Sequence, residues 1–149
     1  MSRKINCLQI DGLGHLWVGS DEGLNIYDGR NYWFNGNDFY SVPDGSFNDM
    51  FFAEDGKKYF ATNTGVITLI EGKISYYSYG AWLLHPTVTK ITVSDNGTIA
   101  AVTPRGISLI TAKEQHHIGY IHRITHSAGR LLCGIRSFIN CKGSINPTW

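Results

Sequence analysis

The chain has 149 residues, a formal net charge of +1, 42% hydrophobic residues, 17% charged residues and 17 glycines. This length and composition predict one turn-rich globular domain with a sizeable core. The near-neutral charge, without a long basic run, gives no electrostatic footprint for nucleic acid, and no stretch approaches the roughly 20 apolar residues that span a bilayer.

The first part of the chain predicts four short strands. Residues 5–11 alternate well enough to form a strand with Leu8 and Ile10 on one face. The sequence Asp-Gly-Leu-Gly at 11–14 favours a hairpin turn, because Asp and Gly tolerate the backbone conformations that tight turns require. Further strands are expected at 16–20, 24–27 and 32–34.

The same order of strands and turns follows twice more. We expect strands at 49–53, 58–62, 66–70 and 73–77 in the second copy, and at 90–93, 98–102, 107–111 and about 115–120 in the third. A decayed fourth copy is expected over 121–135, followed by an irregular tail at 136–149. No segment has a sustained helical period, so almost no helix is expected.

Each of the three clear copies contains two glycines nine residues apart, namely Gly14 and Gly23, Gly56 and Gly65, and Gly97 and Gly106. Successive copies are offset by 42 and 41 residues, and an aromatic residue lies between the glycines in two of them, Trp17 and Tyr59. Such a period, with several short strands per copy, is typical of β-propeller blades. The predicted fold is therefore all-β: three four-stranded antiparallel blades at about 5–40, 47–82 and 88–120 plus a degenerate fourth, forming a partial propeller over 1–135.

The sequence from Gly14 to Tyr27, Gly-x-Leu-Trp-Val-Gly-Ser-x-x-Gly-Leu-x-x-Tyr, resembles the two-component regulator propeller repeat. That repeat recurs in the extracellular sensor domains of bacterial hybrid histidine kinases and in related carbohydrate-linked propellers. The resemblance implies sensing of an oligosaccharide or another ligand. It implies structural roles for the repeat glycines, which make turns, and for the aromatic residue, which packs between blades.

We expect that three to four blades do not close an ordinary propeller ring, which has roughly four to eight. Two interpretations remain open: the chain is a fragment of a longer sensor propeller, or copies of it associate to complete the ring. The first would place it in the periplasm or outside the cell. A complete chain with only three cysteines, Cys7, Cys133 and Cys141, would fit the cytoplasm.

Aromatic residues gather in the outer strands and connections after the first two copies. Flat rings stack on sugars while neighbouring polar groups bind hydroxyls. The candidate ligand contacts are Tyr32, Trp33, Asn35, Tyr40, Tyr77, Tyr79 and Trp82. The alternative is that these aromatic side chains cover the edge of a blade.

Histidines cluster late in the chain, at His116, His117, His122 and His126, with Cys133 and Cys141 nearby. Zinc takes His and Cys ligands, but the spacing fits no known finger pattern, and partly solvated strand histidines account for the cluster. We therefore predict no metal and no other cofactor.

An enzyme would need a base and a charge stabiliser. The residue types used by polysaccharide lyases occur at Tyr79, His85, Lys90 and Arg105, but their spacing forms no signature. No catalytic residue is predicted. We expect a non-catalytic ligand-binding or interaction module, with a propeller lyase or hydrolase fragment, or a structural remnant without its own ligand, as the alternatives.

Overall fold

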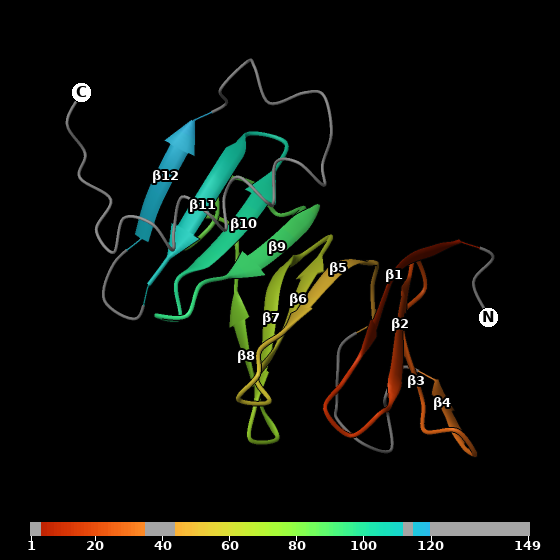
Figure 1. Ribbon diagram of the computed structural model, residues 1–149. Coiled ribbons are helices and arrows are strands. Elements are labelled where there is room, and N and C mark those ends of the chain that lie inside the picture. The colour runs from red at the N-terminus through yellow and green to blue at the C-terminus, as the bar shows by residue number, and fades with distance from the viewer. Residues whose placement is uncertain (1–3, 35–43, 112–114, 120–149) are drawn as a thin grey trace.

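The computed structural model describes residues 4–34, 44–111 and 115–119, which form three antiparallel sheets of four strands each (Figure 1). The first sheet contains β1 (Ile5–Ile10), β2 (Leu16–Ser20), β3 (Leu24–Tyr27) and β4 (Tyr32–Phe34). The second contains β5 (Phe47–Phe52), β6 (Lys58–Thr62), β7 (Gly65–Ile70) and β8 (Lys73–Tyr77). The third contains β9 (Lys90–Val93), β10 (Ile99–Thr103), β11 (Gly106–Ile110) and β12 (Gln115–Gly119).

The prediction of an all-β fold is confirmed, and the described residues contain no helix. The strands lie within one or two residues of the predicted positions. The largest difference is at β5, which begins at Phe47 rather than at Asp49, because a bulge between these two residues lets pairing with β6 continue. The predicted degenerate fourth copy and the tail lie outside the described residues.

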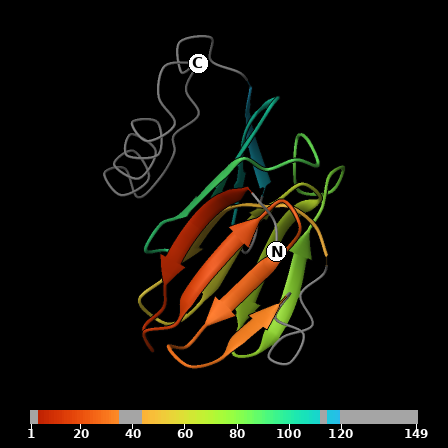
Figure 2. The same ribbon diagram turned by 90° about the vertical axis from the view of Figure 1, so that its right-hand side faces the viewer.

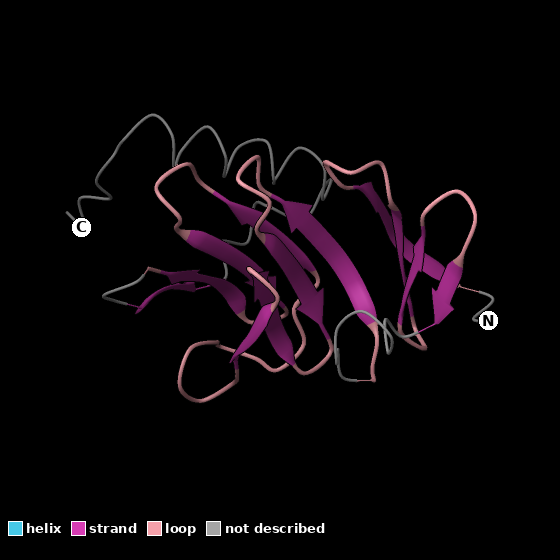
Figure 3. Ribbon diagram, turned by 90° about the horizontal axis from the view of Figure 1, so that it is seen from below, coloured by secondary structure: helices cyan, strands magenta, loops and turns pink. Residues whose placement is uncertain are grey.

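The strands of each sheet are paired in chain order, and the sheets are packed on one another in chain order (Figures 1 and 3). The first strands make this contact: β1 lies against β5, and β5 lies against β9. Figure 2 views the molecule with β1 to β4 in front of the other sheets.

The repeat glycines lie at backbone positions that other residues rarely adopt. The first glycine of each pair has φ of 84°, 84° and 81°, and the second has 148°, 139° and 133°, in the order of the copies. The second position is also crowded, since a Cβ on Gly65 would strike the carbonyl oxygen of Tyr77 on the neighbouring strand β8. These constraints give the nine-residue glycine spacing a physical basis in all three sheets.

A hydroxyl side chain completes the turn that ends at the second glycine of each pair. Thr62 Oγ1 donates to the Gly65 carbonyl at 2.8 Å and accepts the Thr64 N–H at 3.2 Å. Ser20 and Thr103 make the same two bonds in the first and third sheets. Each copy therefore has Ser or Thr three residues before the second glycine. The hydroxyl closes the turn, and its own donor and acceptor are both satisfied although it is buried.

The core consists of apolar layers between successive sheets rather than within one sheet. Trp17 from the first sheet is buried together with Phe47, Met50 and Phe60 of the second. Tyr59 from the second sheet is buried together with Val88, Ile91 and Ile99 around the third. Trp17 and Tyr59 occupy the same repeat position, so each carries its ring from one sheet into the layer shared with the next.

Candidate functional site

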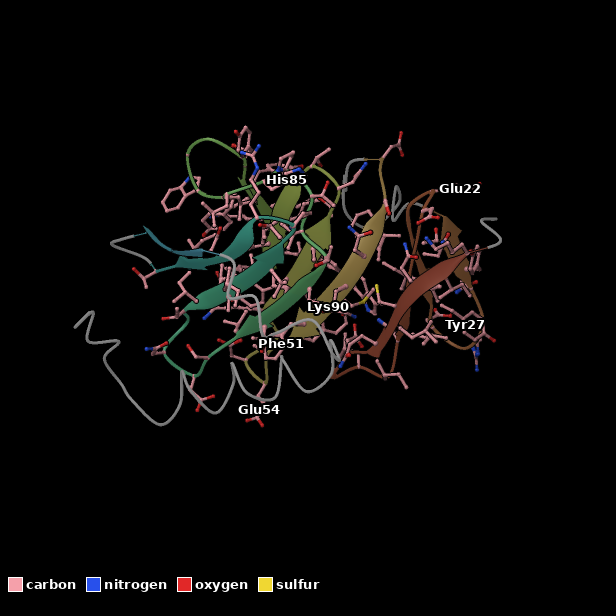
Figure 4. The ribbon with its side chains drawn as sticks, turned by 90° about the horizontal axis from the view of Figure 1, so that it is seen from above. Glu22, Tyr27, Phe51, Glu54, His85 and Lys90 are labelled. Atoms are coloured by element: carbon pink, nitrogen blue, oxygen red, sulfur yellow. The ribbon has the colours of Figure 1, made fainter. Side chains whose placement is uncertain are left out.

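The turns and crossovers of the sheets gather at opposite edges of the molecule. Glu22, in the turn between β2 and β3, and His85, in the crossover from β8 to β9, lie along one edge in Figure 4. Glu54, in the turn between β5 and β6, lies at the opposite edge. Asp21, beside Glu22 on this edge, takes part in polar contacts between the first two sheets.

A polar network, which we call the edge network, connects the first two sheets through Asn6, Asp21, Ser46 and Asn48. Asn6 Nδ2 donates to Asp21 Oδ1 at 2.8 Å and to the Phe47 carbonyl at 3.1 Å. Ser46 Oγ lies 3.3 Å from Asp21 Oδ1 and 2.9 Å from Asn48 Oδ1. The hydrogen bond from Asn6 holds the pKa of the exposed Asp21 carboxyl below its usual value, with help from Lys4, whose Nζ is 3.4 Å away.

The network continues into the crossover through backbone groups. Asn48 Nδ2 donates to the Val88 carbonyl at 2.8 Å, and the Val88 N–H donates to the Thr62 carbonyl at 2.9 Å. Asn6 and Asn48 occupy equivalent positions on β1 and β5, and each donates to a carbonyl just before or at the start of the next first strand. These contacts fix the end of the crossover against the second sheet.

The crossover segment, residues 78–89, is folded onto the third sheet. The Trp82 N–H donates to the Ser78 carbonyl at 3.0 Å, and the Leu84 N–H donates to Ser108 Oγ on β11 at 3.1 Å. The His85 ring nitrogen Nδ1 accepts the Thr87 N–H at 3.1 Å. Leu83 and Val88 are buried, so apolar side chains of the segment itself anchor it on the core.

The aromatic candidates of the second copy differ in exposure. Tyr77 and Trp82 form an edge-to-face ring pair, with centroids 5.2 Å apart, and both pack against the apolar layer between the second and third sheets. Tyr79 is 53% exposed and its neighbour Tyr76 is 55% exposed. The structure thus brings Tyr77, Tyr79 and Trp82 together at one crossover, with Tyr79 presenting the most open ring of the three.

The candidates of the first copy lie on another sheet. Tyr32 is exposed on β4 and is paired with Tyr27 on β3. Trp33 lies in the same strand, but its side chain, like Asn35 and Tyr40, lies outside the described residues. The seven candidates therefore divide between two connections.

The residue types suggested for a lyase divide between Lys90, at the start of β9, and the loops that contain Tyr79, His85 and Arg105. Lys90 Nζ is 3.7 Å from Asp49 Oδ1, on the first strands of the third and second sheets. His85 lies apart from Lys90 in Figure 4, at the edge of the molecule. Arg105 belongs to the turn closed by Thr103, where its N–H is bound by the hydroxyl.

The side chains of the late histidine and cysteine cluster are not among the parts of the chain that the structure describes. Within the part of the chain that the structure describes, no three His, Cys, Asp or Glu side chains lie together as a metal site would require. His116 and His117 lie in β12, where only the backbone is described, whereas His122, His126, Cys133 and Cys141 lie outside the described residues.

A buried charged cluster that the sequence did not reveal joins the first two sheets. Asp11 is buried and accepts the Trp17 Nε1–H at 3.0 Å, and Lys58 Nζ from β6 lies 3.8 Å from its carboxylate. The same ammonium group lies 5.3 Å from the Trp17 ring centroid and 5.4 Å from that of Phe52. Asp11 and Trp17 belong to the first sheet, and Lys58 and Phe52 belong to the second, so the cluster holds these two sheets together.

These features define a class of protein: an array of repeated four-stranded antiparallel sheets. The recurring nine-residue glycine spacing serves the turns, and the edges carry exposed polar and aromatic groups. No helix in the described residues is long and apolar enough to cross a membrane.

The fold is similar to that of solved structures with low sequence identity. The extracellular domain described as hybrid two-component system BT3049 from B. thetaiotaomicron superposes with a TM-score of 0.60 at 21% identity, over 79% of this chain and 17% of that chain. Virginiamycin B lyase from Staphylococcus aureus superposes with a TM-score of 0.58 at 16% identity, over 78% of this chain and 41% of that chain. The chain thus spans less than half the length of either protein.

No protein-family model matches the sequence, and no curated protein matches it. At 21% and 16% identity, the two likenesses show a shared fold and nothing further.

Proposed function

We propose that the chain is a non-catalytic, ligand-sensing segment of a two-component-type propeller, and that its ligand is an oligosaccharide. Its three sheets would then be blades, with a fourth, degenerate blade over 121–135. The observation that carries the proposal is the crossover segment, where the exposed Tyr79 follows Tyr77 of the packed Tyr77–Trp82 pair by two residues. A rigid edge with open aromatic faces and nearby polar groups suits a sugar, whose rings stack on aromatic side chains and whose hydroxyls take hydrogen bonds.

The polar groups needed for sugar hydroxyls are present at the same edge. The edge network contributes amide, carboxylate and hydroxyl groups that are exposed or half-buried, through Asn6, Asp21, Ser46 and Asn48. The crossover is tied to this network by the bond from Asn48 to Val88. A ligand lying across the edge would contact the aromatic and polar groups together, and a position outside the cytoplasm would follow from the sensor role.

A binding experiment with matched tyrosine variants tests the proposal. Binding to an oligosaccharide panel is measured for the wild-type chain, for Tyr79→Ala and for the control Tyr27→Ala, which removes an exposed tyrosine from the first sheet. Loss of one stacking ring should weaken binding about three- to tenfold in Tyr79→Ala. The control should bind as wild type does. Equal affinity of Tyr79→Ala and wild type for every glycan would overturn the assignment of this edge.

Trp82 is retained as a proposed contact, but its variant is a weaker test. Because the Trp82 ring packs on Tyr77 and the apolar layer, Trp82→Ala removes packing and any ligand contact together. Tyr79→Ala separates the two effects.

A polysaccharide lyase is the second candidate, because the chain contains the residue types that such enzymes use. One protein of similar fold, virginiamycin B lyase, is also a lyase, although it is named for another substrate. At 16% identity that likeness concerns the fold alone. His85 and Lys90 lie apart, so these two residues do not form a paired base and charge stabiliser, and we favour the sensor. Formation of unsaturated uronate products from polysaccharides by the purified chain would reverse this preference.

A further inference from the structure

The first sheet exposes a continuous apolar face. Ile5, Leu8 and Ile10 of β1 and Tyr27 of β3 are exposed, with Ile10 at 63%, and Leu13 in the adjoining turn is 80% exposed. The pairing of Leu8 with Val18 places these side chains on the side of the sheet opposite Trp17, Leu24 and Ile26, which are buried against the second sheet. We call this surface the open face; it belongs to the sheet that stands in front in Figure 2.

The second sheet has the same face, and there it is covered. Residues 42 positions after Ile5, Leu8 and Ile10 are Phe47, Met50 and Phe52, and they pair with β6 in the same register, including the same bulge. Phe47 and Met50 are buried, and Phe52 is half-buried. The first sheet covers them, with the Trp17 ring 5.4 Å from the ring of Phe52 in an edge-to-face arrangement.

The third sheet repeats the arrangement. Val88, Ile91 and Val93 lie on the corresponding face, and they are buried in one cluster with Tyr59 of the second sheet. In both described junctions, a sheet covers this face of its successor with an aromatic side chain from the Trp17 position. The open face is therefore built like the two faces that already receive a sheet.

A buried acceptor within the first sheet points to the same partner. Asn25 lies on the open-face side of β3, beside Val18, and is only 2% exposed. No group in the described residues donates to its Oδ1 atom. A buried amide oxygen without a donor is costly, so a donor is expected from a neighbouring segment.

In the third sheet, the equivalent position has a hydrogen-bond donor from the preceding crossover. Ser108 is the residue equivalent to Asn25, and its Oγ accepts the N–H of Leu84, 24 residues earlier in the crossover that leads into the sheet. The same bond in the first sheet would come from the segment that leads into β1. Asn25 thus marks the position of a crossover, in addition to the apolar surface that marks the position of a sheet.

We infer that the open face is a docking surface for a further sheet of the same repeat, which precedes β1 in the same polypeptide and is joined to it by a crossover. The incoming sheet places a Trp or Tyr at its Trp17 position against Leu8 and Ile10. Its crossover donates a backbone N–H to Asn25 Oδ1, as Leu84 donates to Ser108.

A second copy of the chain is a poorer occupant. The matching surface that it would offer is the far side of the third sheet, where Ala100 takes the Trp17 position. Ala100 and Leu109 are already buried there, in a cluster with Ile107. No described sheet therefore has an aromatic ring free to cover the open face of another copy, and the covalent crossover implied by Asn25 also favours a preceding repeat.

A tandem variant tests the inference. Residues 4–45 are duplicated ahead of Lys4, so that Gly45 leads into the original β1 as it normally leads into β5. If the added sheet docks, hydrogen exchange of the original β1 and β2 amides slows by about tenfold or more, as expected when large apolar side chains become buried. The matched control carries Trp17→Ala in the added copy only and should lose most of this protection.

Two results would overturn the inference. One is equal exchange of β1 and β2 in the tandem variant, its Trp17→Ala control and the parent chain. The other is a concentration-dependent dimer of the parent chain in light scattering that Leu8→Lys abolishes, because the open face would then be filled by a second copy. A parent chain that stays monomeric, together with protection in the tandem variant, supports the preceding sheet.

Discussion

Trp17 Nε1 donates to Asp11 Oδ2 across the first hairpin at 3.0 Å, and both residues are buried. Asp11 Oδ1 also accepts the N–H groups of Leu13 and His15. One carboxylate therefore closes the turn and fixes the ring that packs on the second sheet. In the first sheet, the hairpin itself therefore orients the Trp17 ring that packs on the second sheet.

We predict that this carboxylate makes stability depend on acid pH. Burial by itself raises the pKa of Asp11, but the N–H donors of His15, Trp17 and Leu13 outweigh it and leave the pKa below its usual value. The stabilisation is therefore complete above the unfolded-state pKa of about 3.9 and is lost as the pH falls through the lower folded-state value. Urea denaturation of wild type and Asp11→Asn between neutral and strongly acidic pH measures this.

The variant separates Asp11 from other carboxylates. Asp21, Asp28 and Asp55 also have lowered pKa values, so wild type should lose stability in acid for several reasons. At neutral pH Asp11→Asn should cost about 1–3 kcal/mol, because its amide cannot accept from all three donors. This difference should shrink in acid. A difference that stays constant with pH would show that folding does not shift the pKa of Asp11.

Removing the ring should cost more than removing its N–H group. Trp17→Ala should lower the free energy of unfolding by about 3–5 kcal/mol, because it empties the layer shared with Phe52 and Phe60. Trp17→Phe keeps a ring but leaves Asp11 without one donor, and should cost less. Chemical denaturation followed by far-UV circular dichroism compares the two. Equal losses would mean that the hydrogen bond, rather than packing, dominates at this position.

The sequence carried more information about the fold than about the site. Gly14 and Gly23 recur because their backbone conformations are unusual in every copy, so the strands between them could be predicted from spacing. The Ser or Thr three residues before the second glycine also recurs in the sequence and predicts these turns, although glycine spacing alone does not reveal it. By contrast, the position of the half-buried Lys58 depends on Asp11 and Trp17 of another sheet, which no local pattern specifies.

The same limit applies to the aromatic candidates. Tyr76, Tyr77 and Tyr79 are alike in sequence, and only the packing of Trp82 on Tyr77 distinguishes a core-facing ring from the exposed ones. Exposure of a side chain in a crossover depends on which sheet the crossover lies against. Here Leu84 is bonded to Ser108, a contact between residues 24 positions apart.

The two glycines of one pair should differ in their tolerance of alanine. Gly56 has φ of 84° with nothing near its missing Cβ, so Gly56→Ala should cost about 1–2 kcal/mol of backbone strain. At Gly65, with φ of 139°, a Cβ would also collide with the Tyr77 carbonyl oxygen, which belongs to rigid sheet backbone. Gly65→Ala should therefore be clearly more destabilising in thermal and urea unfolding. Similar losses for both would mean that β8 moves away at little cost.

The Cys7 thiol should react slowly with disulfide reagents until the first two sheets separate. Burial, followed by the nearby negative charge of Asp49, raises its pKa to about 12, and its Sγ contacts the Phe47 carbonyl oxygen at 3.7 Å. The reactive thiolate is therefore scarce at pH 8.

In a Cys133→Ser, Cys141→Ser variant, Cys7 should react with a disulfide reagent at least about a hundredfold more slowly in the folded chain than in urea. Adding Trp17→Ala should speed the reaction by loosening the layer beside Cys7, whereas Tyr76→Ala, at an exposed position of the second sheet, should not. Rapid labelling of the folded variant without Trp17→Ala would mean that Cys7 is reached without separating the sheets.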